Sequence, residues 1–163
     1  MRALAKAARV RVMGFDVDGV LTDGGLVFGP EGDQLKIFSS QDGHGLKLLS
    51  AAGITVTVIS GRRSAALAER ARNLGVTHLH MGIEDKRACY AGLLATLGAS
   101  FETAGYMGDD VVDLDVLRAC GFSATVADGH AEVRRQVDYV ARQPGGRGAV
   151  REVCDLLLAA RRT

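Results

Sequence analysis

Short apolar runs alternate with amphipathic stretches along nearly the whole chain, and this alternation constrains the fold more than any other feature. Such alternation is typical of βαβ units. The apolar runs are rich in valine and isoleucine, as expected of parallel strands that are covered on both faces. We therefore expect an α/β fold, a doubly wound, Rossmann-like parallel sheet with helices on both faces. The strands are expected at residues 10–15, 54–59, 76–81, 104–107 and 122–126.

The amphipathic stretches between these runs predict the helices. They are expected at residues 45–52, 64–74, 86–97, 111–120, 131–137 and 149–160. A glycine stands just past four of the expected helix ends, which is where a left-handed residue commonly closes a helix. These glycines are Gly53, Gly75, Gly98 and Gly121.

One segment, "GGLVFGPEGDQLKIFSS" at about 24–40, breaks the alternation. Two β-prone runs, 26–28 and 35–39, flank the turn-forming "GPEGD", so we expect a β-hairpin inserted after the first strand. A second irregular stretch, "PGGRG" at 144–148, opens a C-terminal tail of about 144–163 and is expected to act as a hinge before the last helix.

Length and charge limit the possible functions. A chain of 163 residues is expected to form a single domain over 1–163. Its net charge of +1 gives no basic field for nucleic acid or a membrane surface. The 3 cysteines are odd in number and widely spaced, which favours reduced thiols and no zinc site. No apolar run approaches about 18 residues, and the N-terminus lacks a signal-peptide core, so a cytoplasmic location is expected.

Polar and charged residues gather where the expected strands end. The carboxyl ends of parallel strands meet at one edge of a sheet, which is where such folds bind ligands. We expect these side chains to converge there from distant parts of the sequence. They are Asp16 and Asp18 after the first strand, Ser60 and Arg62 after the second, Lys86 after the third, and Asp109, Asp110 and Asp113 after the fourth.

A compact group of carboxylates suits Mg²⁺, which prefers oxygen ligands and often binds a substrate phosphate as well. The cation would cancel the repulsion between the aspartates and let Asp16 approach an anionic phosphoryl group. Asp16 could then attack phosphorus, while Asp18 protonates the leaving oxygen and later deprotonates water. Ser60 could donate to a phosphate oxygen, and Lys86 could neutralise its charge.

Other interpretations of the same residues remain open. A strand-ending aspartate is often only a turn or helix cap, and Asp110 and Asp113 fit that role as well as a supporting one near a metal. The "DVDG" stretch resembles a calcium loop, but Val27 stands where that loop needs glutamate. A signalling receiver domain has similar acids and a lysine, yet its phosphorylated aspartate follows the third strand, not the first.

The motif "DVDGVLTD" resembles the first motif of the haloacid dehalogenase superfamily of phosphatases, and Ser60, Lys86 and "GDDVVD" follow in that superfamily's order. Over nearly the whole chain, "QDGHGLKLL", "SGRRS", "LGVTHLHMG", "GYMGDDVVDLDVL" and "GGRGAVREVCDLLL" closely resemble the family of 3-deoxy-D-manno-octulosonate 8-phosphate (KDO 8-phosphate) phosphatases. The resemblance implies Mg²⁺-dependent hydrolysis of this ester through an aspartyl phosphate, during lipopolysaccharide assembly.

The resemblance also implies a role for each matching residue. Asp16 would be the nucleophile and Asp18 the acid/base. The side chains of Asp16 and Asp109 and the main-chain carbonyl of Asp18 would hold Mg²⁺. Asp110 and Asp113 would support them, and Ser60 and Lys86 would bind the phosphoryl group. Gly61 would be a further substrate-binding residue, and Arg62, Asp42 and Gly43 would lie near the sugar acid. Gln41 stands where a basic residue is expected, which leaves one contact to the substrate carboxylate open.

The chain has no room for the cap domain that many members of this superfamily carry, because only the hairpin separates Asp16 from Ser60. The resembled family forms homotetramers in which a neighbouring subunit closes the active site. The apolar hairpin suits such an interface, and Arg147 could reach across it or be a plain surface charge. The main alternative is a phosphatase of another sugar-acid phosphate, such as sialic acid or KDN 9-phosphate, and a receiver-like signalling or binding module is a weaker one. The intact set of acids argues against a third alternative, a non-catalytic domain of a sugar-nucleotide transferase.

Overall fold

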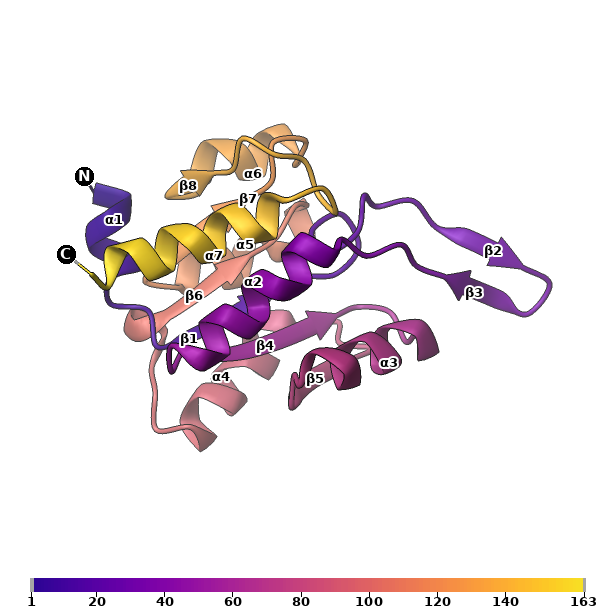
Figure 1. The fold of residues 1–163 in the computed structure, drawn as a ribbon, viewed down its shortest axis with the longest axis horizontal. Helices are drawn as coiled ribbons and strands as arrows, with labels where there is room; N and C mark the ends of the chain where they lie inside the picture. The colour runs from indigo at the N-terminus through magenta and orange to yellow at the C-terminus, as the bar shows by residue number, and fades with distance from the viewer. Residues whose placement is uncertain (1, 163) are drawn as a thin grey trace.

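The computed structural model describes residues 2–162, without the side chains of residues 33 and 34. Its main sheet has six strands in the order β5-β4-β1-β6-β7-β8, and all the paired strands are parallel (Figure 1). Strand β1 lies inside the sheet, because the chain builds β4 and β5 on one side of it and then returns to build the other side. This reversal opens a crevice at the carboxyl ends of the central strands. The doubly wound α/β fold predicted from the sequence is confirmed.

The strands of the sheet are short and mostly buried. They are β1 (Val12–Phe15), β4 (Thr55–Ser60), β5 (His78–Met81), β6 (Ala104–Met107), β7 (Phe122–Thr125) and β8 (Tyr139–Val140). The first five agree with the expected strands to within two residues at each end. The two-residue strand β8 was not expected, because it is too short to carry a period-2 pattern.

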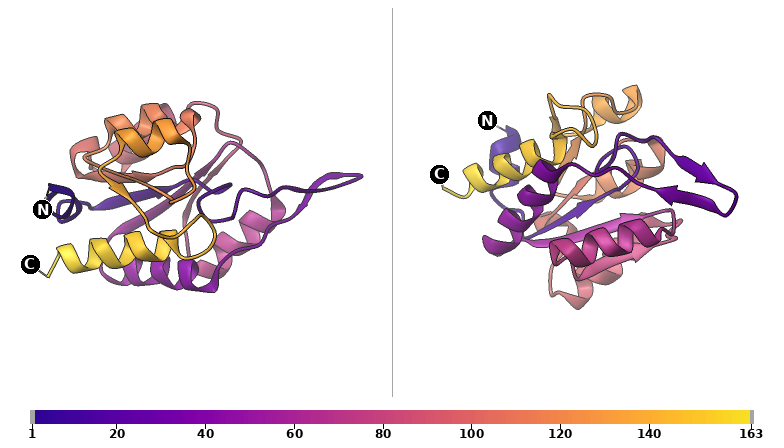
Figure 2. Two further views of the ribbon diagram at one scale, coloured as in Figure 1. Left: turned by 90° about the horizontal axis from the view of Figure 1, so that it is seen from above. Right: turned by 45° about the vertical axis from the view of Figure 1, so that its right-hand side comes forward.

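Helices cover both faces of the sheet, as the turned view in Figure 2 shows. One face carries α2 (Ser40–Ala51), α3 (Ala65–Leu74) and α7 (Ala149–Ala160), and the other carries α4 (Lys86–Thr96), α5 (Leu114–Ala119) and α6 (Ala131–Gln136). A separate apolar cluster fills the space under each layer. A short helix, α1 (Arg2–Ala7), packs beside α7 near the two chain ends. Among residues 2–162, no helix combines the length and the apolar character that crossing a bilayer requires.

Two helix starts differ from the sequence prediction, and one helical turn was not expected. Helix α2 begins at Ser40 instead of residue 45, because Ser39 caps it by accepting a hydrogen bond from Asp42 N, and two glycines in its first turns hide the helical pattern. The expected 111–120 helix starts as a 3₁₀ turn, Val111–Asp113, before α5. A second 3₁₀ turn at Phe101–Thr103 was not expected. Of the four expected closing glycines, Gly53, Gly75 and Gly98 have positive φ, whereas Gly121 does not.

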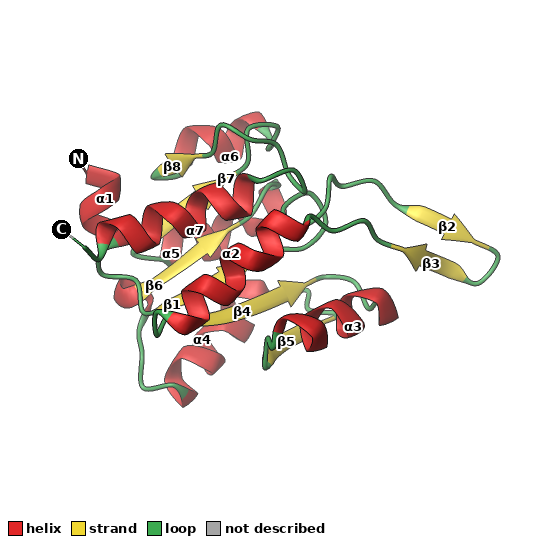
Figure 3. Ribbon diagram, viewed as in Figure 1, coloured by secondary structure: helices red, strands yellow, loops and turns green. Residues whose placement is uncertain are grey.

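The inserted hairpin is formed by β2 (Val27–Gly29) and β3 (Gly32–Leu35). It projects from the body of the protein beyond the carboxyl ends of the strands, as the strand arrows in Figure 3 make visible. Its second strand lies earlier than the expected 35–39, since that run forms the extended connection to α2 instead. The hairpin therefore stands beside the crevice in which ligands of this fold bind.

Candidate active site

The carboxyl ends of β1, β4 and β6 and the start of α4 surround one cleft of about 510 Å³. Most of the residues that the sequence analysis singled out at strand ends line this cleft. The lining residues are Asp16, Asp18, Gly61, Arg62, Ile83, Glu84, Lys86, Asp109, Asp110 and Val112. Ser60 and Asp113 lie directly behind this lining, and both are buried. Side chains separated by up to about 100 positions in the sequence thus meet at one edge of the sheet.

Lys86 links the acidic residues at the floor of the cleft. Its ammonium nitrogen Nζ lies 2.7 Å from Asp16 Oδ1 and 2.7 Å from Asp113 Oδ1. The side chain is only 7% exposed. Burial lowers the pKa of Lys86, but Asp16 and Asp113 outweigh this effect and raise the pKa, so the lysine stays charged. A buried cation fixed in this position is suited to neutralising an incoming phosphoryl group.

Asp113 positions the loop that carries Asp109. Its Oδ1 accepts the hydrogen bond from Lys86, and its Oδ2 accepts hydrogen bonds from the backbone N–H groups of Asp109 and Asp110 at 3.1 and 3.3 Å. Both carboxylate oxygens are therefore already engaged, and the side chain is fully buried. Asp110 is exposed and caps the 3₁₀ turn through Val111 N at 2.7 Å. Both residues have the capping contacts that the sequence analysis considered.

The carboxylates of Asp16, Asp109 and Asp113 offer oxygen atoms within 4.8 Å of one another. Burial, followed by the charge of Asp113, raises the pKa of Asp16 to about 6. Burial, followed by the charge of Asp16, raises the pKa of Asp109 to about 8. Like charges crowded in a poorly solvated site resist ionisation, and a divalent cation removes that resistance. An oxygen-only donor set of this kind fits Mg²⁺.

The loop after β1 closes tightly against this cluster. Gly19 has φ +89°, and a Cβ at this position would collide with the Asp109 carboxylate. On the other side, Gly146 N donates a hydrogen bond to Val20 O at 2.9 Å, and Gly145 packs against the backbone of Gly19 and Thr22. The 144–148 stretch is therefore packed against the loop that carries Asp18, and its role as a hinge stays a prediction. Small residues are needed there because two backbone segments approach closely.

Arg62 lines the wall of the cleft nearest β4, and Ser60 lies buried behind that wall. The Ser60 hydroxyl accepts a hydrogen bond from Arg62 N at 3.1 Å, which leaves its own hydrogen available to a phosphate oxygen. The Arg62 side chain is 47% exposed, and its Nε lies 3.8 Å from Asp18 Oδ2. Gly61, between them, lines the opening of the cleft.

Lys36 was missed by the sequence analysis. It follows β3 on the hairpin, and its Nζ lies 2.6 Å from Asp18 Oδ1. A search restricted to the strand ends of the main sheet cannot find it, because the hairpin is an insertion that only the tertiary structure brings to the cleft. The available signal was a lysine surrounded by apolar residues, in "QLKIF".

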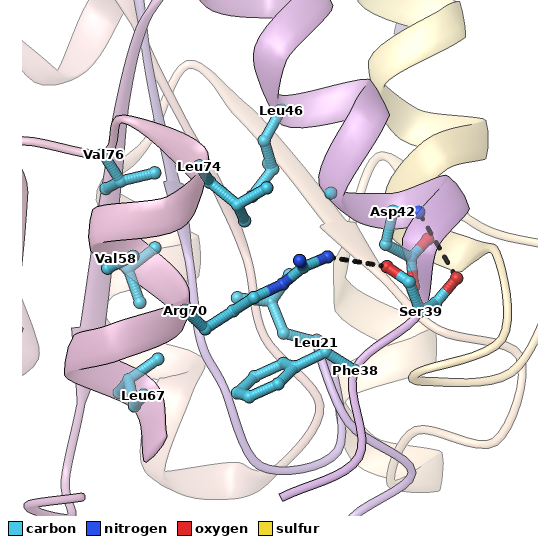
Figure 4. A pocket seen from close by; sticks show the side chains of 12 residues that line it. Leu21, Phe38, Ser39, Asp42, Leu46, Val58, Leu67, Arg70, Leu74 and Val76 are labelled. Carbon is cyan, nitrogen blue, oxygen red and sulfur yellow. Dashed lines mark hydrogen bonds between the residues drawn. The ribbon is translucent and has the colours of Figure 1, made fainter. Parts of the chain in front are cut away.

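Asp42 and Gly43 lie apart from this cleft, in a narrow cavity between α2, α3 and the connection from the hairpin (Figure 4). The Asp42 carboxylate accepts hydrogen bonds from Arg151 N at 2.9 Å and Gly148 N at 3.4 Å, so it caps the start of α7. Gly43 faces Arg70, which donates to Ser39 O at 3.2 Å and stacks over Phe38. The cavity has room for about one water molecule (about 10 Å³), which is too little for a sugar. The structure therefore shows Asp42 capping α7 and Gly43 packed against Arg70, and the substrate contact of both residues stays a prediction.

Arg147 also lies outside the cleft of its own chain. It is exposed, and together with Gln41 it lines a broad surface groove of about 730 Å³ that runs along α7. Neither residue is among those that line the Asp16 cleft.

A doubly wound sheet with paired aspartates after β1, a hydroxyl after β4, a lysine at the start of α4 and acids after β6 defines a phosphatase of the haloacid dehalogenase class. No family model matches the chain. A curated relative, the 3-deoxy-D-manno-octulosonate 8-phosphate phosphatase of Yersinia pestis, is 46% identical over 157 residues, which cover 96% of this chain and 84% of that protein. The chain belongs to the family of 3-deoxy-D-manno-octulosonate 8-phosphate phosphatases.

Solved structures agree with this assignment. The enzyme from Yersinia pestis superposes with a TM-score of 0.96 at 45% identity, over 99% of this chain and 87% of that one. The enzyme from Moraxella catarrhalis, solved in complex with magnesium, phosphate and KDO, superposes with a TM-score of 0.95 at 40% identity, over 99% of this chain and 94% of that one.

Proposed function

We propose that this chain hydrolyses KDO 8-phosphate to KDO and inorganic phosphate with the help of Mg²⁺, as a step of lipopolysaccharide assembly. The observation that carries this proposal is the contact of Asp16 with Lys86 at the floor of a cleft that Asp109 also lines. That arrangement supplies a nucleophile, a charge-neutralising cation and a metal-binding carboxylate at one point. The identity of the substrate is inferred from the family, because the geometry of the site alone does not distinguish between phosphate esters.

In the first step, Asp16 attacks phosphorus. The bond between Asp16 and phosphorus forms as the bond from phosphorus to the sugar oxygen breaks, and Asp18 gives its proton to that oxygen. An aspartyl phosphate and free KDO result. Lys86 and Ser60 face the phosphoryl oxygens and stabilise the charge that gathers on them.

In the second step, water attacks the aspartyl phosphate. Asp18, now ionised, takes a proton from the water, the new bond from oxygen to phosphorus forms, and Asp16 leaves as a carboxylate. Phosphate departs and both aspartates return to their starting states. Asp18 thus serves as acid and then as base, which explains why two carboxylates stand one residue apart.

Mg²⁺ would be held by the side chains of Asp16 and Asp109 and by the main-chain carbonyl of Asp18. When bound, the ion supplies positive charge that offsets the repulsion between the nucleophile and the phosphoryl group. Asp113 and Asp110 hold the loop of Asp109 in place. Gly61 and Arg62 line the cleft, where they would contact the substrate.

We further propose that the chain is a single domain that assembles as a homotetramer in the cytoplasm. The hairpin exposes apolar side chains that one ribbon cannot bury: Val27, Phe28, Leu35 and Ile37 are 47%, 61%, 63% and 78% exposed. A second subunit packed on this hairpin would also cover the cleft beside it, and Arg147 of that subunit could then contact the substrate. Sedimentation of the purified protein tests the assembly, and an active monomer would contradict it.

The proposed reaction is tested by measuring phosphate release from KDO 8-phosphate, sialic acid 9-phosphate and KDN 9-phosphate, with Mg²⁺ and after chelation. We expect KDO 8-phosphate to give the highest kcat/KM and chelation to abolish turnover. A higher kcat/KM with either nine-carbon ester would reassign the substrate. Full activity after chelation would reject the metal's role.

A further inference from the structure

The lysine at the base of the hairpin makes an unusual contact with the cleft. Lys36 Nζ lies 2.6 Å from Asp18 Oδ1, and the Lys36 side chain is only 2% exposed. Its neighbours in the chain, Leu35 and Ile37, are 63% and 78% exposed. Because successive side chains of an extended strand point to opposite sides, Lys36 is turned inward while the apolar residues next to it face outward.

The direction of Lys36 is unexpected on physical grounds. A lysine ammonium loses its hydration when it is buried, so lysine is seldom fully buried without a partner. On an extended ribbon, the apolar Leu35 and Ile37 would be the residues expected to face the protein. The chain instead places the charged residue inward, in direct contact with the carboxylate proposed as acid and base.

The two oxygens of Asp18 have different environments. Oδ1 accepts the short hydrogen bond from Lys36, whereas Oδ2 has Arg62 Nε at 3.8 Å, which is beyond hydrogen-bond distance. The Asp18 side chain is 22% exposed and lines the cleft. The hydrogen bond to Oδ1 restrains the rotation of the carboxyl group, and no described residue donates a hydrogen bond to Oδ2.

We propose that Lys36 is a positioning residue for Asp18: it anchors Oδ1 so that Oδ2 carries the proton to the leaving oxygen. This inference rests on the proposed function. In the first step the bond from Oδ2 to hydrogen breaks as the sugar oxygen takes the proton, and in the second step the water proton forms that bond again. Because Lys36 belongs to the hairpin, the position of the hairpin, and any subunit packed on it, controls the orientation of Asp18.

The proposal is tested with two substrates that differ in their need for an acid. The alcohol oxygen of KDO 8-phosphate must be protonated as it leaves, whereas 4-nitrophenolate leaves as a stable anion without a proton. Single-turnover experiments with enzyme in excess report only the first step for each substrate. The variants are Lys36→Met, Lys36→Gln, which keeps a neutral donor, and Lys36→Arg, which keeps the charge. Lys47→Met, at an exposed lysine of α2, is the matched control, and Asp18→Asn is the reference for loss of the acid.

For Lys36→Met, we expect the single-turnover rate of KDO release to fall about 10- to 100-fold, while nitrophenolate release stays within about threefold of the unsubstituted protein. The rate of KDO release in Lys36→Gln should lie between that of Lys36→Met and that of the unsubstituted protein. Lys36→Arg should recover most of this rate, and Lys47→Met should change neither the rate of KDO release nor that of nitrophenolate release. Asp18→Asn should show the same selective loss as Lys36→Met.

An equal fall of both rates in Lys36→Met and Lys36→Gln would overturn the inference, because it would indicate a structural or phosphate-binding role. Unchanged rates in both variants would overturn it as well. If the unsubstituted protein fails to hydrolyse KDO 8-phosphate at all, the proposed function itself is wrong. That outcome is distinct, because a protein that releases nitrophenolate but not KDO still has a working phosphoryl site. Release of the alcohol from a nine-carbon sugar-acid phosphate then takes the place of KDO release in the comparison with nitrophenolate.

Discussion

Lys86 Nζ lies 2.7 Å from Asp16 Oδ1, and both side chains are less than a tenth exposed. The lysine comes from the start of α4 and the aspartate from the end of β1, 70 positions apart. A buried ion pair of this kind is not an efficient way to stabilise a fold, since desolvation offsets much of its attraction. Its position at the floor of the cleft fits the phosphoryl-binding role proposed for Lys86 and the nucleophilic role proposed for Asp16.

Lys86→Met should lower kcat/KM about 100- to 1,000-fold, because the phosphoryl oxygens lose a fixed cation in a poorly solvated site. Phosphate release with KDO 8-phosphate checks this. Arg87→Met is the matched control, since Arg87 is the next residue of the same helix and is exposed. A comparable loss in both variants would indicate damage to α4 and no specific role for Lys86.

Asp16→Asn should lower turnover about a thousandfold or more, because an amide cannot attack phosphorus in place of a carboxylate. The fold should survive, since asparagine keeps the shape and removes a charge that burial disfavours. Mass spectrometry of acid-quenched protein should find a phosphoryl group on Asp16 in the unsubstituted protein and none in the variant. Asp23→Asn, at an exposed carboxylate of the same loop, should keep both activity and label.

The metal-free protein should become less stable as the pH rises. The pKa values of Asp16 and Asp109 are raised to about 6 and about 8 from 3.8, so the native state holds more protons than the unfolded state between those limits. The contribution of these two groups to the free energy of unfolding therefore falls as the pH rises from about 4 to about 8. Thermal unfolding in chelator should show Tm falling by several degrees across this range.

Mg²⁺ should reverse this trend, because the ion binds the ionised carboxylates. The gain in Tm on adding Mg²⁺ should thus be larger at pH 8 than at pH 6. Asp109→Asn should flatten the pH dependence of the metal-free protein and weaken the response to Mg²⁺. A gain in Tm that is the same at both pH values would contradict the proposed metal site.

Asp42→Ala should destabilise the protein by about 1–2 kcal/mol, since two backbone N–H groups at the start of α7 lose their acceptor. Its KM for KDO 8-phosphate should stay close to that of the unsubstituted protein. Chemical denaturation and steady-state kinetics check the two quantities separately. A raised KM with unchanged stability would favour the substrate contact predicted from the sequence over the capping role seen in the structure.

The sequence by itself determined the architecture and the chemistry of the cleft. Alternating apolar runs specify buried parallel strands, and parallel strands all present their carboxyl ends at one edge. Asp16, Lys86 and Asp109 could therefore be assigned to one site without coordinates, because the rule depends only on local patterns and strand order. The hairpin and α7 could be recognised for the same local reason.

Only the tertiary structure decided which polar residues work together across elements. The glycines of the "DGHG" stretch predict a loop, but the structure places Asp42 in the first turn of α2. Its carboxylate caps α7, whose residues lie more than 100 positions away in the sequence. The glycines at 144–148 predict a hinge, and in the structure they allow the C-terminal tail to pack closely against the loop after β1. The sequence shows Lys36 only as a single charged residue of the hairpin segment, but in the structure its ammonium group donates a hydrogen bond to Asp18. Each of these contacts depends on distances between elements, and neither local periodicity nor residue type carries that information.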